Sequence, residues 1–340
     1  MLDRWAQKWQ QWRRRGAARP APGPDPFGAL LQRHSDALRA PYLRALLGAD
    51  LDTTISVPER LLGQVVVQQL RDSEQRRAVV PRLPTVIPLL LKQLRDPTAS
   101  THTYVAIIRQ DAVVASAMLK IANSVHFNPY RKPIDTFESA VQTLGAQGMR
   151  LVLSTAVLQP IMRSQYGSLP QKVWDHSLAC AVCCQQLAKS AAQDPFQAYL
   201  LGLVHDIGVV TLFNQLQQQR VEQALDATSS AALLAQLIER WAAQLGYWIT
   251  QDWQLPADIV RAIASQDSAE AIGETPLGRV LRRANCISEG YQLLREKKLE
   301  RAALQRIARE LECPENLLDQ LDAVFTTAIS AETPEDPARA

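Results

Sequence analysis

Apolar residues recur at helical spacing along almost the whole chain, and no stretch alternates convincingly with the period of two that a half-buried strand requires. In one run, five such residues fall on a single helix face: Leu83, Ile87, Leu90, Leu91 and Leu94. The 340 residues, 47% of them hydrophobic, can bury a sizeable core as one large or two moderate domains. The sequence therefore predicts an all-α fold, a helical bundle.

Two of the helical runs carry the side chains best suited to bind a metal ion. Residues 173–192 contain His176, and residues 194–208 end in the adjacent pair His205 and Asp206, followed by Ile-Gly. Imidazole and carboxylate groups from neighbouring helices are common ligands of divalent metals. The structural alternative is that the same groups, buried near helix ends, cap the helices and pair with each other.

The segments around these residues resemble a known superfamily. LLGLVHDIG and WDHSLACA are similar to the HD superfamily, and specifically to its HDOD branch (HD-related output domain). Further similar segments follow the same order: LPTVIPLLLKQLRDP, IIRQDAVVASAMLKIANSVHFN, AVQTLGAQGMRLVLSTAVL and DWQLPADIVRAI. The resemblance covers roughly residues 81–266. It implies an HD-like helical core with an N-terminal helical half, in a branch whose members often keep parts of the HD motif without hydrolase chemistry.

The chain departs from the pattern of metal-dependent HD enzymes at the last ligand. Those enzymes complete the ligand set with an Asp on a late helix, and here Asn285 stands at the similar place in VLRRANCIS. A neutral amide is a poor substitute for a carboxylate on a divalent metal. No His follows His205, so a binuclear phosphodiesterase site is not expected. The resemblance thus implies a vestigial cluster of His176, His205, Asp206 and Asn285, with no bound metal, no cofactor and no catalytic residue.

Three of the five cysteines lie close together, at Cys180, Cys183 and Cys184, one helical turn after His176. Their number and spacing do not resemble a secreted disulfide framework. Small sulfur side chains on a buried helix face usually act as hydrophobic residues, and this is the favoured interpretation. A soft-metal or redox site is the alternative.

The net charge of +3 is unevenly distributed. The residues before Pro20 contain six basic side chains against one acidic one, which gives them +5 and leaves −2 for the rest. Sequence-independent nucleic-acid binding depends on many Lys and Arg contacts to phosphates. A nucleic-acid partner is therefore disfavoured.

Residues 1–16 form a segment rich in Trp and Arg, here called the Trp segment. Trp5, Trp9 and Trp12 recur at spacings of four and three, which places them on one stripe of an amphipathic helix with most basic residues elsewhere. Residues 17–26 contain four prolines and are typical of an extended linker. We expect the Trp stripe to dock on a partner or on the protein's own body, and a weak contact with a membrane surface is the alternative.

The remaining boundaries follow from composition and from the resemblance. We assign a helical preface to residues 27–80, the HDOD domain to 81–270, a C-terminal helical layer to 271–331 and a tail to 332–340. No apolar run of about 18 residues and no apolar signal-peptide centre are apparent. We therefore expect a cytoplasmic protein, with membrane association through the N-terminal segment as the alternative.

Three functions are consistent with these observations. The favoured one is a non-enzymatic bacterial signal-transduction module that acts through contacts with other signalling or regulatory proteins. The second is a metal-dependent HD phosphohydrolase, a phosphodiesterase or nucleotidase, with one ion at the vestigial cluster. The third is binding of a small ligand, such as a cyclic nucleotide, without turnover, although no motif supports that ligand.

Overall fold

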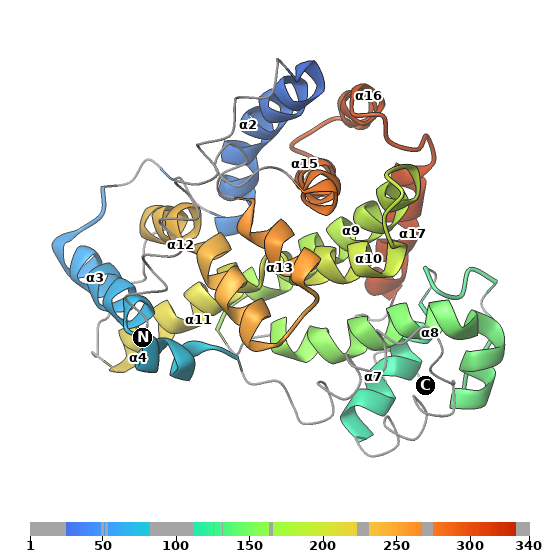
Figure 1. Cartoon of the computed structure of the whole chain (residues 1–340), viewed down its shortest axis with the longest axis horizontal. Coiled ribbons are helices and arrows are strands. Elements are labelled where there is room, and N and C mark those ends of the chain that lie inside the picture. The colour runs from blue at the N-terminus through green and yellow to red at the C-terminus, as the bar shows by residue number, and fades with distance from the viewer. Residues whose placement is uncertain are drawn as a thin grey trace, which may run out of the picture. The chain divides into compact units, whose positions relative to one another are not determined.

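The computed structural model describes residues 25–48, 51, 54–81, 112–124, 126–130, 132–162, 166–222, 231–266 and 275–330. Every regular element in these ranges is a helix, which confirms the all-α prediction (Figure 1). The helices are α2 (Pro26–Leu47), α3 (Val57–Arg71), α4 (Ser73–Val79), α7 (Ala112–Ala122), α8 (Phe137–Met162), α9 (Leu169–Ser190), α10 (Pro195–Val204), α11 (Ile207–Glu222), α12 (Ala231–Asp252), α13 (Ala257–Ala264), α15 (Pro276–Arg295), α16 (Arg301–Glu310) and α17 (Leu317–Ser330).

Several sequence predictions fall on residues that the structure does not describe. The Trp segment with Trp5, Trp9 and Trp12, the apolar run of residues 83–94 and the tail of residues 332–340 all lie outside the described ranges. The predicted linker of residues 17–26 overlaps the first described helix at its end. Asp25 caps α2 by accepting a hydrogen bond from the Gly28 amide, and the helix begins at Pro26.

The chain divides into two compact units. The first consists of residues 1–82 and 161–312, and the second of residues 83–160 and 313–340. The division falls within α8, near its C-terminal end, and again between α16 and α17. The predicted domain boundaries remain predictions, because compactness alone does not establish which parts fold independently.

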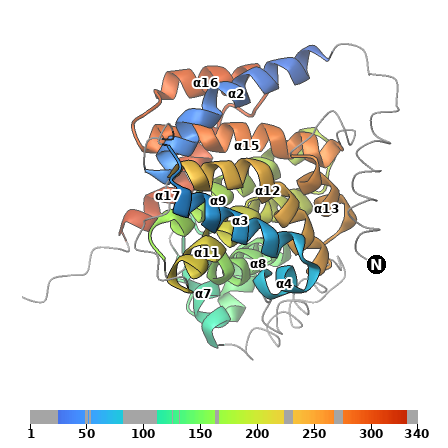
Figure 2. The ribbon, with the colours of Figure 1, turned by 90° about the vertical axis from the view of Figure 1, so that its left-hand side faces the viewer.

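Helix α9 forms the centre of the first unit. Residues 180–184, which include three cysteines, are completely buried, so this part of the helix is covered on all sides. α10 and α15 pack against α9, and α2 packs against α15 and α9. α3 packs against α11 and α12, and α13 contacts α12 and α15 (Figure 2). The preface helices α2 and α3 are thus part of the same packed unit as α9.

Two glycines allow neighbouring helices to approach closely beside the His205-Asp206 pair. A Cβ on Gly202 of α10 would lie 2.4 Å from the Ala181 Cα of α9. A Cβ on Gly208 of α11 would lie 2.0 Å from the Ala242 carbonyl oxygen of α12. Real Cβ atoms are not found so close to backbone atoms. The glycine that follows the HD pair in the sequence is therefore explained by packing of α11 on α12.

One expectation about membrane spans is wrong. Residues Pro195–Glu222, which form α10 and α11, are long and apolar enough to cross a membrane by length and composition, because an 18-residue window within them has a mean hydropathy of 1.5. However, 89% of that window is buried inside the protein. An interior helix of a folded core has the same composition as a membrane span, so this stretch is weak grounds for one.

In the second unit, Asn123 ends α7 with a set of hydrogen bonds. Its Nδ2 donates to the carbonyl oxygens of Leu119 (2.9 Å) and Ile134 (2.7 Å), and its Oδ1 accepts from the Ile134 amide (3.0 Å). The side chain therefore fastens the end of α7 to the segment before α8. α8 itself changes direction at Gly145, whose φ of 64° lies in the left-handed region.

Candidate functional site

The four residues of the predicted cluster come together in the first unit. His176 lies on α9, His205 and Asp206 form the turn between α10 and α11, and Asn285 lies on α15. The His176 and His205 Nε2 atoms are 3.3 Å apart, and they lie 2.9 and 3.2 Å from the Asn285 Oδ1. Each Nε2 is also 3.5 Å from the Asp206 Oδ2. Four donor atoms from three separate parts of the chain thus converge on one point.

The backbone fixes the orientation of His205. Its Nδ1 donates to the Gly202 carbonyl oxygen at 2.8 Å, which assigns the proton to that nitrogen and directs Nε2 into the cluster. His176, 2% exposed, points its own Nε2 to the same place. Its ring is 4.9 Å from that of Tyr42 on α2, centroid to centroid. Both imidazoles are therefore held with a single nitrogen available to the cluster.

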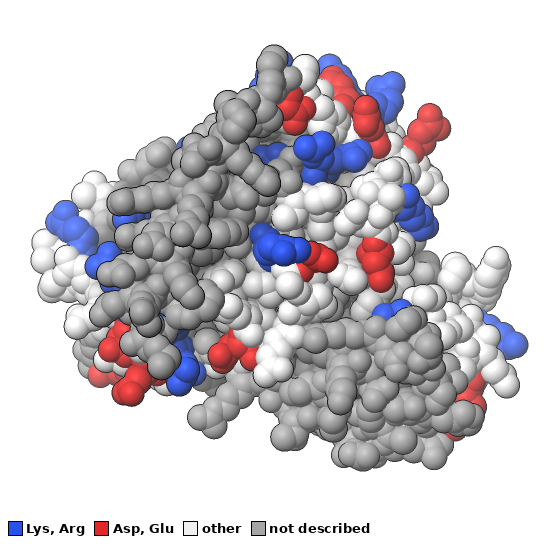
Figure 3. All heavy atoms as spheres, viewed as in Figure 1, with Lys and Arg blue, Asp and Glu red and all other residues white. Residues whose placement is uncertain are grey.

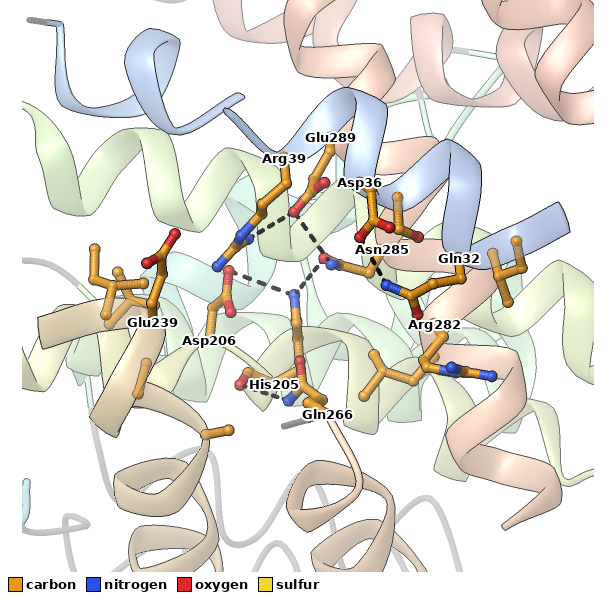
Figure 4. Close-up of a pocket in the computed structure, with 17 residues that line it drawn as sticks. Gln32, Asp36, Arg39, His205, Asp206, Glu239, Gln266, Arg282, Asn285 and Glu289 are labelled. Atoms are coloured by element: carbon orange, nitrogen blue, oxygen red, sulfur yellow. Dashed lines mark hydrogen bonds and ion pairs between the residues drawn. The ribbon is translucent and has the colours of Figure 1, made fainter. Parts of the chain in front are cut away.

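An ion pair that the sequence did not predict closes the cluster. The Asn285 Nδ2 lies 3.3 Å from the Glu289 Oε1, one turn further along α15, and this hydrogen bond turns the Asn285 Oδ1 toward the imidazoles. Arg39, on α2, donates from Nη1 to the same Glu289 Oε1 at 2.7 Å. The Glu289 side chain is only 2% exposed, so the pair is shielded from water on the carboxylate side. Figure 4 shows these groups pointing toward one another.

Charges within the cluster shift the pKa values of its members. Burial alone would raise the pKa of Asp206, but His205, His176 and Arg39 outweigh burial and lower it. Burial lowers the pKa of His176 to about 4, so this imidazole is neutral. Burial also acts to lower the pKa of His205, yet Asp206 and Cys180 raise it above its ordinary value. The cluster thus contains a carboxylate beside one cationic and one neutral imidazole.

Arg39 is the most firmly charged group of the site. Burial acts to lower its pKa, and the carboxylates of Glu289 and Asp206 outweigh that effect and raise it. The pKa of Glu289 is raised by burial, against which Arg39 acts. Arg39 thus stands beside Glu289, and His205 beside Asp206. Burial acts to raise the pKa of the Cys180 thiol, but its hydrogen bonds with Cys184 and His205 and the charge of His205 lower that pKa to about 6, which adds a further negative group beside His205.

A pocket of about 350 Å³ opens onto the cluster. Helices α2, α11, α12 and α15 supply its walls, and His205, Asp206 and Asn285 lie within it (Figure 4). Its charged lining comprises four acids, two arginines and the His205 imidazole: Asp36, Asp206, Glu239, Glu289, Arg39, Arg282 and His205. Negative groups therefore outnumber positive ones, which is unfavourable for an anionic ligand bound alone.

The donor atoms fit the arrangement of a single metal centre. Ligand atoms that share one divalent ion at about 2.1 Å stand roughly 3.0–3.4 Å from each other. The five separations given above, 2.9 to 3.5 Å, lie at or close to that range. His176, His205, Asp206 and Asn285 would hold such an ion, with the Gly202 carbonyl orienting one imidazole. The ion would supply Lewis-acid polarisation of a phosphoryl oxygen.

Sequence reasoning missed Arg39 and Glu289. Glu289 had a detectable signal, because it lies one helical turn after Asn285 on the same predicted helix. Arg39 had none, because its place depends on how α2 packs on α15. The three cysteines of α9 are buried thiols that form no disulfide, and Cys180 contacts Cys184 and His205 through side-chain hydrogen bonds.

A family model shows to which family the chain belongs. The model described as the HDOD domain matches residues 80–269, more than half of the chain. The chain belongs to the HDOD family. Helices α2 and α15 lie outside the matched residues, although they supply Arg39, Asn285 and Glu289 to the site.

Among known sequences, the HDOD chain resembles an uncharacterized protein of Treponema pallidum (strain Nichols). The two are 24% identical over 222 residues, which are 62% of this chain and 43% of that protein. The chain therefore spans less than half the length of this relative.

Solved structures share the fold at low identity. A candidate metal-dependent phosphohydrolase from Shewanella amazonensis SB2B has a TM-score of 0.55 at 19% identity, covering 78% of this chain and 98% of that one. An HDOD domain protein of unknown function from Geobacter sulfurreducens has 0.52 at 20%, covering 80% and 94%. A candidate signal-transduction protein from Marinobacter aquaeolei VT8 has 0.51 at 16%, covering 84% and 68%. These likenesses establish the fold alone.

Proposed function

We propose that this HDOD chain is a non-enzymatic module of bacterial signal transduction that acts through contacts with other signalling or regulatory proteins. The observation that carries the proposal is the closure of the HD cluster by Asn285, whose amide oxygen bonds both imidazoles while its nitrogen bonds Glu289. An amide is a weaker metal ligand than the carboxylate found in HD hydrolases. The cluster then serves to join α9, α15 and the α10–α11 turn.

The charges of the cluster support the same role. Arg39 lies beside Glu289, and both imidazoles lie beside Asp206, so each carboxylate has a partner within the cluster. A buried polar network rigidifies and specifies a fold, and here Asn285 and the two carboxylates bind within the cluster, while the buried His176 Nδ1 has no hydrogen-bond partner among the described residues. We infer that the network fixes the positions of helices whose outer surfaces bind the partner.

Surface charge favours a protein partner over a nucleic acid. On the face drawn in Figure 3, the described Lys and Arg residues stand among Asp and Glu residues and form no broad basic area there. We propose a cytoplasmic location, with the Trp5, Trp9 and Trp12 segment recruiting the partner. Weak contact of that segment with a membrane surface is the alternative.

The second candidate is a metal-dependent phosphohydrolase. The five donor separations favour it, because they suit one divalent ion without rearrangement. A cyclic nucleotide or other small ligand in the pocket of about 350 Å³ is less favoured, since the lining has more acids than bases.

An assay of hydrolysis combined with a measurement of stability tests the proposal. Purified protein supplied with Mn²⁺ is offered bis(p-nitrophenyl) phosphate, p-nitrophenyl phosphate and nucleoside phosphates, and we expect no turnover above that of Asp206→Ala. Asp206→Ala should lower the free energy of unfolding by about 1–3 kcal/mol, because its cationic partners lose their carboxylate. Asp258→Ala, at an exposed ion pair of α13, serves as the matched control and should cost less than about 0.5 kcal/mol.

The opposite pattern would reject the proposal. If the wild-type protein hydrolyses any of these substrates and Asp206→Ala abolishes the activity without lowering the melting temperature, the cluster is a working active site.

A further inference from the structure

We propose that Arg39 is a built-in cation that keeps the four-donor cluster from holding a divalent ion, which makes α2 an inhibitory element over that cluster. The inference rests on the proposed non-enzymatic function. It gives a reason why four donor atoms with suitable geometry would bind a divalent ion only weakly. It concerns a residue outside the matched family region, on a helix that the HD motif does not include.

The first support is the position of Arg39. It lines the same pocket as His205, Asp206 and Asn285, and its guanidinium bonds the Glu289 carboxylate that also holds Asn285. Asp206 experiences the charges of His205, His176 and Arg39. The guanidinium therefore acts on the one carboxylate that would ligate the ion (Figure 4).

The second support is the count of charges at the cluster. A divalent ion held by two neutral imidazoles would put +2 beside the +1 of Arg39, against the two carboxylates Asp206 and Glu289, a net +1. Without Arg39, the same site with the ion would be neutral. An uncompensated charge in a buried site is costly, and like charges repel strongly where water is excluded.

The third support is the attachment of α2 on both sides of Arg39. Toward the start of the helix, the His34 Nε2 lies 2.8 Å from the Glu310 Oε2 of α16. Toward its end, the Lys172 Nζ of α9 donates to the Ala45 carbonyl oxygen at 2.7 Å. Tyr42, one turn after Arg39, is buried against the His176 ring. Arg39 is thus held in place at the cluster by contacts to several helices.

Binding of Mn²⁺ to the full chain tests the inference. Mn²⁺ is the probe because it prefers carboxylate and imidazole ligands to the thiols of nearby Cys180, and free Mn²⁺ is measured by electron paramagnetic resonance. Arg39→Gln should bind one Mn²⁺ at least about tenfold more tightly than the wild type. Arg39→Lys, which keeps the charge, should bind as weakly as the wild type.

Two further variants locate the effect. Arg282→Gln removes the other guanidinium of the pocket and should change Mn²⁺ affinity far less than Arg39→Gln does. Adding Asp206→Asn to Arg39→Gln should abolish the gain, because the ion then loses its carboxylate ligand. Equal affinity of the wild type and Arg39→Gln overturns the inference, and so does tight binding of one Mn²⁺ by the wild type.

An Arg39→Gln variant that is destabilised still tests the inference. If Arg39→Gln unfolds at working temperature because Glu289 lacks its partner, Mn²⁺ should restore folding, since a ligand of the native state raises its melting temperature. An unfolded variant that millimolar Mn²⁺ does not rescue counts against the inference. Equal affinities without hydrolysis overturn this inference alone, whereas hydrolysis by the wild type overturns the proposed function.

Discussion

Asn285 sets the charge of the buried cluster. Its amide accepts from the imidazole side and donates to Glu289 without adding a charge. A carboxylate at the same place would put a third negative group beside Asp206 and Glu289. Close carboxylates in a buried site raise each other's pKa and oppose ionisation. The amide is therefore suited to a cluster that contains no metal ion.

Asn285→Asp tests this account of the residue. In the presence of a chelator, we expect it to lower the free energy of unfolding by roughly 1–3 kcal/mol, because the new carboxylate lacks a compensating cation. Mn²⁺ should raise the melting temperature of this variant more than that of the wild type. Asn316→Asp, at an exposed position, is the control and should not be destabilised. An Asn285→Asp protein as stable as the wild type in chelator would contradict the account.

At the residue scale, the resemblance to the HD motif predicted four residues of the site but not Arg39 and Glu289. His176, His205, Asp206 and Asn285 could be assembled from the sequence because the resemblance supplied their relation, and the structure brings them together. Arg39 could not be predicted, because an arginine in an amphipathic helix usually faces solvent. Only the packing of α2 on α15 shows that it reaches Glu289.

At the element scale, the site depends on how closely α11 approaches α12. Gly208 allows that approach at the start of α11, two residues after Asp206. The sequence predicted these helices but not their separation, since helical periodicity indicates which face is buried and not which backbone lies against it. The apolar stretch of α10 and α11 shows the same limit, because composition does not distinguish a core helix from a membrane helix and only its burial in the fold does.

Gly208→Ala should therefore damage the site through packing. The added methyl group would overlap the Ala242 carbonyl, and we expect a loss of roughly 1–3 kcal/mol or more in the free energy of unfolding. Gly246→Ala on α12 is the matched control, because the nearest atom to its Cβ would be the Ile263 Cγ2 at 3.4 Å, and Ala is a better helix former than Gly. Equal stability of both variants in thermal unfolding would mean that the close approach carries no such constraint.

At the scale of the whole molecule, the chain joins an HDOD region to helices and segments outside it. The all-α class and the family were both predictable from sequence, and both are confirmed. The bounds of the two compact units were not predictable, because residues distant in sequence form each of them. The role of the Trp segment remains a prediction, since it lies outside the described residues.

Removing residues 1–16 tests the role of that segment. We expect the shortened chain to keep the melting temperature of the full chain and to lose a partner that the full chain retains in a pull-down, because the predicted linker separates the segment from the folded part. Sedimentation with vesicles rich in anionic lipid distinguishes the membrane alternative. A large fall in melting temperature would show instead that the Trp stripe packs on the protein's own body.

The metal content of the native protein tests the central claim most directly. The full-length chain, purified without chelators, is analysed by inductively coupled plasma mass spectrometry beside Asp206→Ala. Because Arg39 already lies against Glu289 at the cluster and Asn285 supplies an amide in place of a carboxylate, we predict far less than one equivalent of any divalent metal in both proteins. One equivalent in the wild type that disappears in Asp206→Ala would contradict the account.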